Sequence, residues 1–202
     1  PNIANDVTGE YRGTDLQVHR LRADEGAHYT VFSLWDTFRS LHPLLNWLEP
    51  ERSRDFVRTM LRMYQQGGQL PVWELAANYT GCMIGYHSVP VITDALSWGI
   101  DAFDHDLALE AMVQAADSAH LGLPAYASLG YIPLDEEHES VSKTLEYAFD
   151  DACIARFARR VPNSDPSMVK RFEQRALHYR NLYNEKSGFF QPKRAAAWLE
   201  NF

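Results

Sequence analysis

The sequence is poor in the residues that mark the commonest special sites. Only two of its 202 residues are cysteines, Cys82 and Cys153, and their spacing matches neither a disulfide framework nor a zinc site. The histidines form no i, i+4 pair of the kind that holds a metal on a helix. No phosphate-binding loop, dinucleotide fingerprint or nucleophile elbow occurs. Apolar runs stay shorter than the ~18–20 residues of a membrane span. The residues alone therefore predict no metal site and no membrane span.

Positive charge is also scarce. The chain has 19 Lys and Arg against 27 Asp and Glu, a net charge of -8, and its cations form no run. This balance argues against nucleic acid or an anionic membrane as the main partner. Hydrophobic residues, in contrast, make up 46% of the chain and include 5 Trp, 10 Tyr and 10 Phe. That share predicts one folded domain with a sizeable core, whose aromatic rings pack inside or stack on sugar faces.

Apolar residues recur at helical spacing between loops that contain Gly and Pro, and this predicts a series of helices. The expected ranges are about Ser33 to Arg39, Pro50 to Gly67, Cys82 to Trp98, Asp104 to His120, Ser140 to Arg160 and Asp165 to Asn184. Ser33 and Asp36 match a capping box, and Asp165-Pro166 matches an N-cap followed by proline in the first turn. Pro43 and Pro90 are expected to interrupt or kink their helices.

The remaining stretches read as loops. Residues 69–79 are expected to form a loop or a short extended piece, residues 122–133 a long loop, and residues 189–202 an unanchored end. No convincing strand pair is visible. The sequence therefore predicts an all-α architecture of paired helices. Such pairs suit part of an α/α toroid, in which inner and outer helices alternate, although a compact bundle fits the same pattern.

The densest group of polar and aromatic residues lies in Trp35-Asp36-Thr37-Phe38-Arg39. Helical spacing puts Trp35 and Arg39 on one face, with Asp36 beside it. A Trp, a carboxylate and a guanidinium together can hold a sugar ring by stacking and by hydrogen bonds to vicinal hydroxyls. The structural alternative is an Asp–Arg pair that ties two helices together.

Glu74 stands between Trp73 and Leu75 in an apolar setting. Desolvation raises the pKa of such a carboxyl, so Glu74 is a candidate general acid. The alternative is a loop Glu that caps a helix or makes a salt bridge. His87 is a second candidate that can reach a hydroxyl, although a lone His on an apolar helix is more often a core residue. The carboxylates of Asp94, Asp150 and Asp151 carry the same ambiguity.

Several segments taken together resemble the central block of glycoside hydrolase family 92, whose members are exo-acting α-mannosidases. In order along the chain they are YRGTD from Tyr11, YTVFSLWDTFR from Tyr29, WEL from Trp73, CMIGYHSVP from Cys82 and SVSKTLEYAFDD from Ser140. The resemblance implies that Glu74 is the general acid and that Trp35 and Asp36 lie near the terminal mannose. Arg39 and His87 are their expected neighbours in binding substrate.

The resemblance also implies what the complete protein does. It is expected to remove terminal α-linked mannose, as an α-1,2-mannosidase, from N-glycans or mannan, with calcium and with inversion at the anomeric carbon. Residues 1–202 are then a partial (α/α)6 catalytic domain, without the N-terminal β-sandwich and the C-terminal part of the barrel. The implied partners are a mannose-containing glycan and the rest of the catalytic domain, and the implied location is secreted, periplasmic or cell-surface.

The chain departs from the family pattern in two places. The general base is expected in an Asn-Asp-Asp segment and the calcium ligands near a Glu-Gly-Asn stretch, and neither occurs. Inverting hydrolysis needs two carboxyl groups ~6.5–9.5 Å apart. We therefore expect this chain alone to be inactive and to lack the calcium ligands. The alternative is a non-catalytic helical domain that binds a glycan or a protein.

Overall fold

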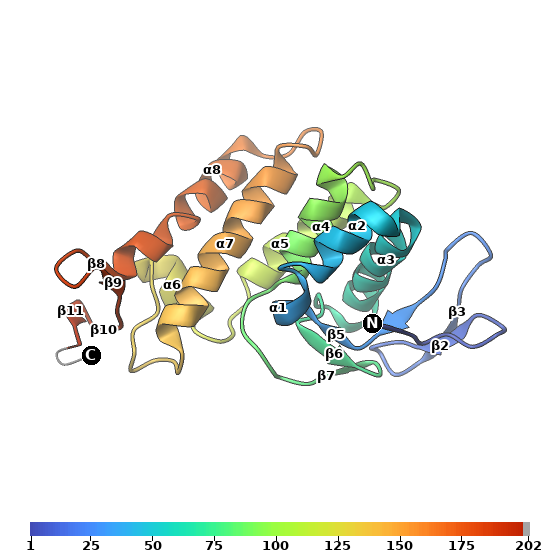
Figure 1. Ribbon diagram of the computed structural model, residues 1–202, viewed down its shortest axis with the longest axis horizontal. Coiled ribbons are helices and arrows are strands. Elements are labelled where there is room, and N and C mark those ends of the chain that lie inside the picture. The colour runs from blue at the N-terminus through green and yellow to red at the C-terminus, as the bar shows by residue number, and fades with distance from the viewer. Residues whose placement is uncertain (200–202) are drawn as a thin grey trace. The chain divides into compact units, whose positions relative to one another are not determined.

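The computed structural model describes residues 1–199, which form two compact units, Pro1–Ala115 and Ala116 onwards (Figure 1). Both units are mainly helical, as predicted. The prediction that strands are missing is wrong, because short strands occur in both units. Each strand has only two or three residues, too few for the alternation by which strands are recognised in a sequence. Among residues 1–199, no helix combines the length and apolar character that a membrane crossing requires.

Helix α3 (Pro50–Gly67) is the centre of the first unit. It begins with Pro50 at a position where the missing N–H costs no intrahelical bond, and it ends at Gly68, whose φ of 75° closes the helix. Phe56 and Met60 are buried at helical spacing. Helices α2 (Leu41–Leu48) and α4 (Ser88–Ser97) pack against α3. The range predicted for this helix is confirmed.

Three other predicted helices differ from the structure. The stretch from Ser33 forms only the single turn α1 (Leu34–Thr37), and the break precedes Pro43, which lies in the first turn of α2. The expected helix from Cys82 begins only at Ser88, because Gly81, Met83 and Gly85 have positive φ values that a helix excludes. Pro90 therefore lies in the first turn of α4, where proline needs no kink. Helix α5 is His105–Ala116, shorter than predicted.

Three small antiparallel sheets complete the first unit. Strand β1 (Asn2–Ile3) pairs with β4 (Tyr29–Thr30), and β2 (Glu10–Arg12) pairs with β3 (Val18–Arg20). The third sheet has the order β5 (Phe32–Ser33), β6 (Trp73–Leu75) and β7 (Asn78–Tyr79). In it Ser33 lies opposite Trp73, and Phe32 lies opposite Glu74. This sheet places two sequence-distant candidate segments side by side.

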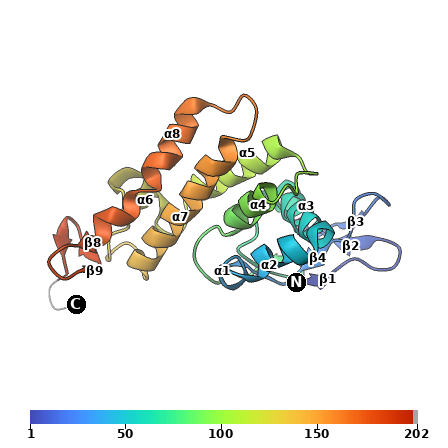
Figure 2. The same cartoon turned by 45° about the horizontal axis from the view of Figure 1, so that its top comes forward.

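The second unit is built on α7 (Ser140–Ala158) and α8 (Pro166–Arg175), which pack along each other (Figure 2). The carboxylate of Asp165 accepts from the N–H of Ser167 at 2.8 Å, so the predicted N-cap is confirmed. The predicted end of this helix at Asn184 is wrong, because α8 stops at Arg175 and a 3-10 turn, η1 (His178–Leu182), follows. The predicted loop at 122–133 contains helix α6 (Leu123–Leu129).

The expected unanchored end is also attached. Strands β8 (Tyr183–Asn184) and β9 (Phe189–Phe190) form one hairpin, and β10 (Lys193–Arg194) and β11 (Ala197–Trp198) form another. The N–H of Leu134 donates to the carbonyl of Lys193 at 2.8 Å, and the N–H of Gln191 donates to the carbonyl of Leu182 at 2.9 Å. Residues 200–202 of that prediction lie outside the described residues.

Candidate functional site

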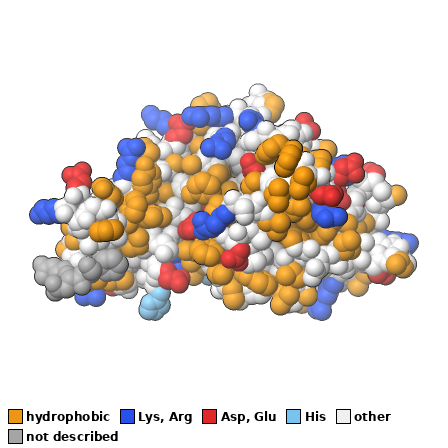
Figure 3. Space-filling view, in the orientation of Figure 1, with side chains coloured by type: hydrophobic (Ala, Val, Ile, Leu, Met, Phe, Trp, Pro, Cys, Tyr) orange, Lys and Arg blue, Asp and Glu red, His pale blue; other side chains and the backbone are white. Residues whose placement is uncertain are grey.

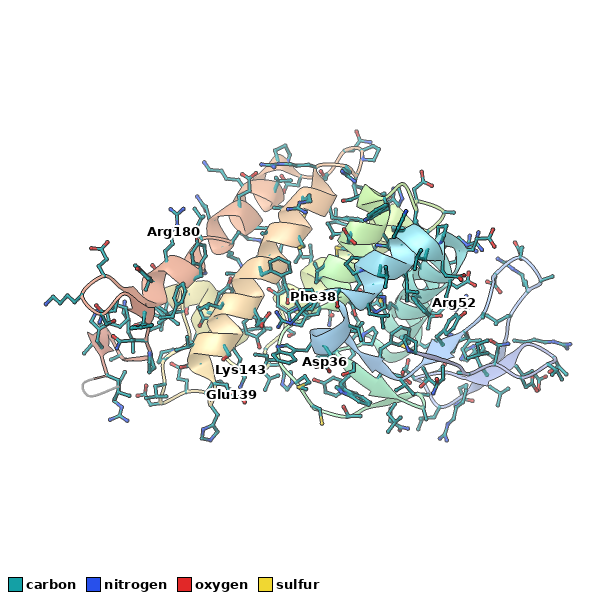
Figure 4. All side chains as sticks on the ribbon, in the orientation of Figure 1. Asp36, Phe38, Arg52, Glu139, Lys143 and Arg180 are labelled. Atoms are coloured by element: carbon teal, nitrogen blue, oxygen red, sulfur yellow. The ribbon has the colours of Figure 1, made fainter. Side chains whose placement is uncertain are left out.

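The segment from Ser33 to Arg39 carries three of the predicted site residues, Trp35, Asp36 and Arg39, and Asp36 extends from α1 (Figure 4). Ser33 is the N-cap of α1, but no side-chain cap bond to the backbone forms. Instead its hydroxyl donates to the carboxylate of Asp36. The capping box predicted from Ser33 and Asp36 is therefore replaced by a bond between the two side chains. This bond fixes an exposed carboxylate beside the start of the helix.

A stack of rings and one guanidinium joins this segment to His87. The guanidinium of Arg39 lies 4.7 Å from the ring centre of Trp35 and 4.6 Å from that of Phe38. Phe38 in turn stacks on His87, with ring centres 4.3 Å apart and planes 17° apart. The structure thus brings Trp35, Asp36, Arg39 and the buried His87 into one neighbourhood. Phe38 was not among the predicted site residues, although its position three residues after Trp35 was the available signal.

Trp73 faces the same side of the third sheet as Ser33. The two residues are opposite each other across β5 and β6, and side chains alternate between the two faces along a strand. The half-buried ring of Trp73 therefore belongs to the Ser33 side, and Glu74 belongs to the other. The hydroxyl of Thr80 donates to the carbonyl of Trp73 at 2.6 Å, which holds the end of the hairpin against this strand.

Glu74 is buried, with 2% of its surface exposed, beside a cavity of about 90 Å³. Its carboxylate accepts from the hydroxyl of Thr30 at 2.8 and 3.0 Å, from the N–H of Val31 at 3.0 Å and from the N–H of Ala77 at 2.6 Å. Burial raises the pKa of Glu74, as its apolar neighbours predicted, while these hydrogen bonds act to lower the pKa. These hydrogen-bond partners of Glu74, Thr30, Val31 and Ala77, lie outside the group of Trp35, Asp36, Arg39 and His87.

The remaining carboxylates make structural bonds. Asp94 accepts from the amide of Asn46 at 2.9 Å. Asp151 is fully buried and accepts from the hydroxyl of Tyr126 and from Nε of Arg175, both at 2.8 Å. Asp150 is equally buried. The structural reading of Asp94 and Asp151 is therefore the one that the contacts support.

No group of three or more His, Cys, Asp or Glu side chains that could hold a metal ion occurs in the described part of the chain. What the neighbourhood of Trp35 offers is an exposed carboxylate, a guanidinium and aromatic rings. Such groups can bind a polyhydroxylated ring through stacking and paired hydrogen bonds.

Known proteins of one family resemble most or all of the chain. Residues 1–202 match the glycosyl hydrolase family 92 catalytic domain. A family GH92 α-mannosidase from Bacteroides thetaiotaomicron, solved in complex with mannoimidazole, is 38% identical with a TM-score of 0.93. The match covers 99% of this chain and 26% of that one. An inverting family GH92 mannosidase from the same organism is 36% identical with a TM-score of 0.87, over 98% of this chain and 27% of that one.

A curated relative from Arthroderma benhamiae is described as an uncharacterized secreted glycosidase. It is 26% identical over an alignment of 176 positions, and the match covers 73% of this chain and 22% of the relative. The chain therefore spans about a quarter of the length of the proteins that it matches.

Proposed function

The chain belongs to glycosyl hydrolase family 92, and we propose that it is the central part of the catalytic domain of an α-mannosidase. The observation that supports this most is the match to an α-mannosidase over 99% of the chain, at a TM-score of 0.93. Because the chain spans 26% of that protein, the proposed activity belongs to the complete protein. The proposed reaction is removal of terminal α-linked mannose, of the α-1,2 type, from N-glycans or mannan.

The architecture proposed for the complete domain is an (α/α)6 barrel. The packed pair of α7 and α8 is the kind of unit from which such a barrel is built. Residues 1–202 would then lack an N-terminal β-sandwich and the C-terminal part of the barrel. The proposed location is outside the cytoplasm, supported by the description of the Arthroderma benhamiae relative as secreted.

For the site, we propose that Trp35, Asp36, Arg39 and His87 form the wall that holds the terminal mannose. Asp36 is exposed and oriented by Ser33, so its free acceptor capacity can bind sugar hydroxyls. Trp35 supplies an apolar ring face, and Arg39 supplies donors that match vicinal hydroxyls. His87 is buried and belongs to this wall through its stack with Phe38, which contacts Arg39.

The chemistry needs groups beyond this wall. Inversion requires one carboxylic acid that protonates the leaving oxygen and one carboxylate that activates water. The assignment of Glu74 as the acid stays a prediction that rests on the family resemblance and on its raised pKa. Calcium, if bound in the complete enzyme, would polarise hydroxyl groups of the sugar. We propose that its ligands and the general base come from other parts of that protein.

The complete protein should release free mannose from an α-1,2-linked mannobiose, and NMR should show that the first product has the inverted β configuration. A chelator should remove this activity and calcium should restore it. The 202-residue chain alone should release no mannose. If the complete protein binds the disaccharide without cleaving it, the alternative of a non-catalytic glycan-binding domain replaces the proposal. If it neither binds nor cleaves mannosides, the proposed substrate is wrong.

A further inference from the structure

Three residues in the left-handed backbone region surround the carboxylate of Glu74. They are Val31, with φ of 65°, Ala76, with φ of 49°, and Ala77, with φ of 65°. A side chain disfavours this region, and a β-branched valine disfavours it most. Such residues persist only where neighbouring contacts hold them in place. The contacts around Glu74 are therefore expected to do so.

The N–H groups of all three residues donate hydrogen bonds to the side chain of Glu74 or to that of its partner Thr30. Those of Val31 and Ala77 donate to separate oxygens of the Glu74 carboxylate, at 3.0 and 2.6 Å. That of Ala76 donates to the hydroxyl of Thr30 at 2.7 Å, and the same hydroxyl donates to the Glu74 carboxylate. One buried carboxylate thus organises the hydrogen bonds of all three residues.

These residues stand at two points that shape the candidate site. Val31 lies between β4, which pairs with β1, and β5, which pairs with β6, so the chain changes from one sheet to another at this residue. Ala76 and Ala77 form the two-residue turn between β6 and β7. Positive φ at both positions is the requirement of a type I′ turn, in which Asn-Gly is the favoured pair. Strand β5 leads directly into α1 and its Asp36.

We propose that Glu74 is a positioning residue, which holds the kink at Val31 and the turn at Ala76-Ala77 so that β5 presents Trp35 and Asp36 to the sugar. This inference deepens the proposed function and rests on it. It competes with the prediction that Glu74 is the proton donor. Both carboxylate oxygens accept hydrogen bonds from neighbours within the fold, and the side chain lies on the face of β6 opposite to that of Trp73.

The two roles differ in what can replace the carboxylate. In the complete enzyme, Glu74→Gln removes the acid and turns one acceptor into a donor that faces an N–H. Adding Ala76→Asn and Ala77→Gly gives the turn its favoured sequence, so the turn depends less on Glu74. For a positioning residue, this pair of substitutions restores part of the lost activity. For a proton donor it restores none, because no group in the triple variant supplies the proton.

Activity should be measured on an α-1,2-linked mannobiose and on an aryl mannoside with an acidic leaving group. A positioning role predicts that Glu74→Gln lowers kcat/KM by a similar factor on both substrates and that the added pair regains at least about threefold on both. Loss confined to the mannobiose, with no rescue, would overturn the inference, because general acid catalysis contributes ~100–10,000-fold only where the leaving group needs a proton.

Amide hydrogen exchange in the same protein gives a readout that needs no activity. Glu74→Gln should speed exchange about tenfold in peptides that cover residues 28–34 and 74–80, because bonded N–H groups lose their acceptor. The control is Glu110→Gln, which removes a carboxylate that accepts from the hydroxyl of Tyr64 and should leave these peptides unchanged. Unchanged exchange in Glu74→Gln would contradict the inference even if the enzyme acts on another substrate.

Discussion

The guanidinium of Arg39 lies 4.7 Å from the ring centre of Trp35, and its Nε donates a hydrogen bond to the carbonyl oxygen of the same residue at 3.1 Å. The side chain of Arg39 therefore contacts both the ring and the backbone of Trp35. Because the same guanidinium reaches Phe38, the orientation of Trp35 depends on a stack that extends to His87.

Arg39→Ala should weaken binding of mannoimidazole to the complete protein by about two- to fivefold, because a cation–π contact at an exposed site is worth ~0.5–1 kcal/mol. Arg39→Lys keeps the charge but loses the planar contact to two rings, so it should resemble Arg39→Ala. Isothermal titration calorimetry measures both. Full affinity in Arg39→Lys would show that charge alone matters, and unchanged affinity in both variants would remove Arg39 from the site.

Asp36→Asn should lower kcat/KM by about 10- to 100-fold, since hydrogen bonds to a charged group contribute ~1.5–3 kcal/mol. The loss should be similar for a natural mannoside and for an aryl mannoside, because a contact that holds the sugar is indifferent to the leaving group. Asp106→Asn, in the first turn of α5, is the matched control and should be silent. A loss that depends on the leaving group would give Asp36 a chemical role instead.

The first unit should lose stability in acid through His28. Its ring is buried and stacks on the ring of Tyr11, with ring centres 3.8 Å apart. Burial lowers the pKa of His28 to about 3. Since the folded state resists protonation while the unfolded state titrates near pH 6.5, the contribution is complete above pH 6.5 and is lost as pH falls towards 3. Between pH 7 and pH 5, protonation of His28 alone should lower the free energy of unfolding by about 2 kcal/mol.

Chemical denaturation at pH 7 and pH 5 measures this loss. His28→Gln should shrink the difference between the two pH values, and His138→Gln, at an exposed position, should leave it unchanged. Part of the wild-type loss should persist in His28→Gln, because burial also lowers the pKa of His42, to about 4. An identical pH dependence in wild type and His28→Gln would refute the assignment.

The buried pair of Asp151 and Arg175 should control the stability of the second unit. Arg175→Met leaves the carboxylate of Asp151 buried without its cation, which typically costs ~3–5 kcal/mol. The exposed pair of Arg159 and Glu173 is the control, and Arg159→Met should cost ~0–1 kcal/mol. Adding Asp151→Leu to Arg175→Met should recover much of the loss. Equal unfolding free energies for the two single variants would contradict this account.

Helix α2 carries an exposed apolar face. On α2, Leu44, Trp47 and Leu48 are largely exposed, and apolar side chains gather over this helix in Figure 3. The unburied face agrees with a chain that spans about a quarter of its relatives, since such faces mark surfaces that other parts of a protein cover.

Long periodic helices were the predictable part of the fold. The range of α3 follows from apolar spacing between Pro50 and Gly68, because periodicity, a starting proline and a closing glycine agree. The start of α4 was predicted too early because Met83 adopts a positive φ, which its residue type does not predict. Strands of two residues were missed because their pairing is set by partners distant in the sequence.

The candidate site was predictable in one half only. Trp35, Asp36 and Arg39 are near neighbours in the sequence, so helical spacing was enough to group them. The apolar neighbours of Glu74 predicted a desolvated carboxyl, and the burial of its side chain confirms this part of the prediction. Which face of β6 it lies on depends on the register with β5, and no local signal carries that register. The N–H groups of Val31 and Ala77 reach the Glu74 carboxylate because both residues have positive φ values, and their residue types do not predict such values.

The most direct test of the proposed mannose site is a crystal structure of the complete protein with mannoimidazole bound. In that structure the sugar-like ring should lie against Trp35, with the carboxylate of Asp36 within about 3 Å of its hydroxyl groups. Glu74 should keep its bonds to Val31 and Ala77 and make no contact with the ligand. A ligand bound elsewhere would contradict the proposed site, and a ligand whose reacting centre meets the Glu74 carboxyl would contradict the positioning role of Glu74.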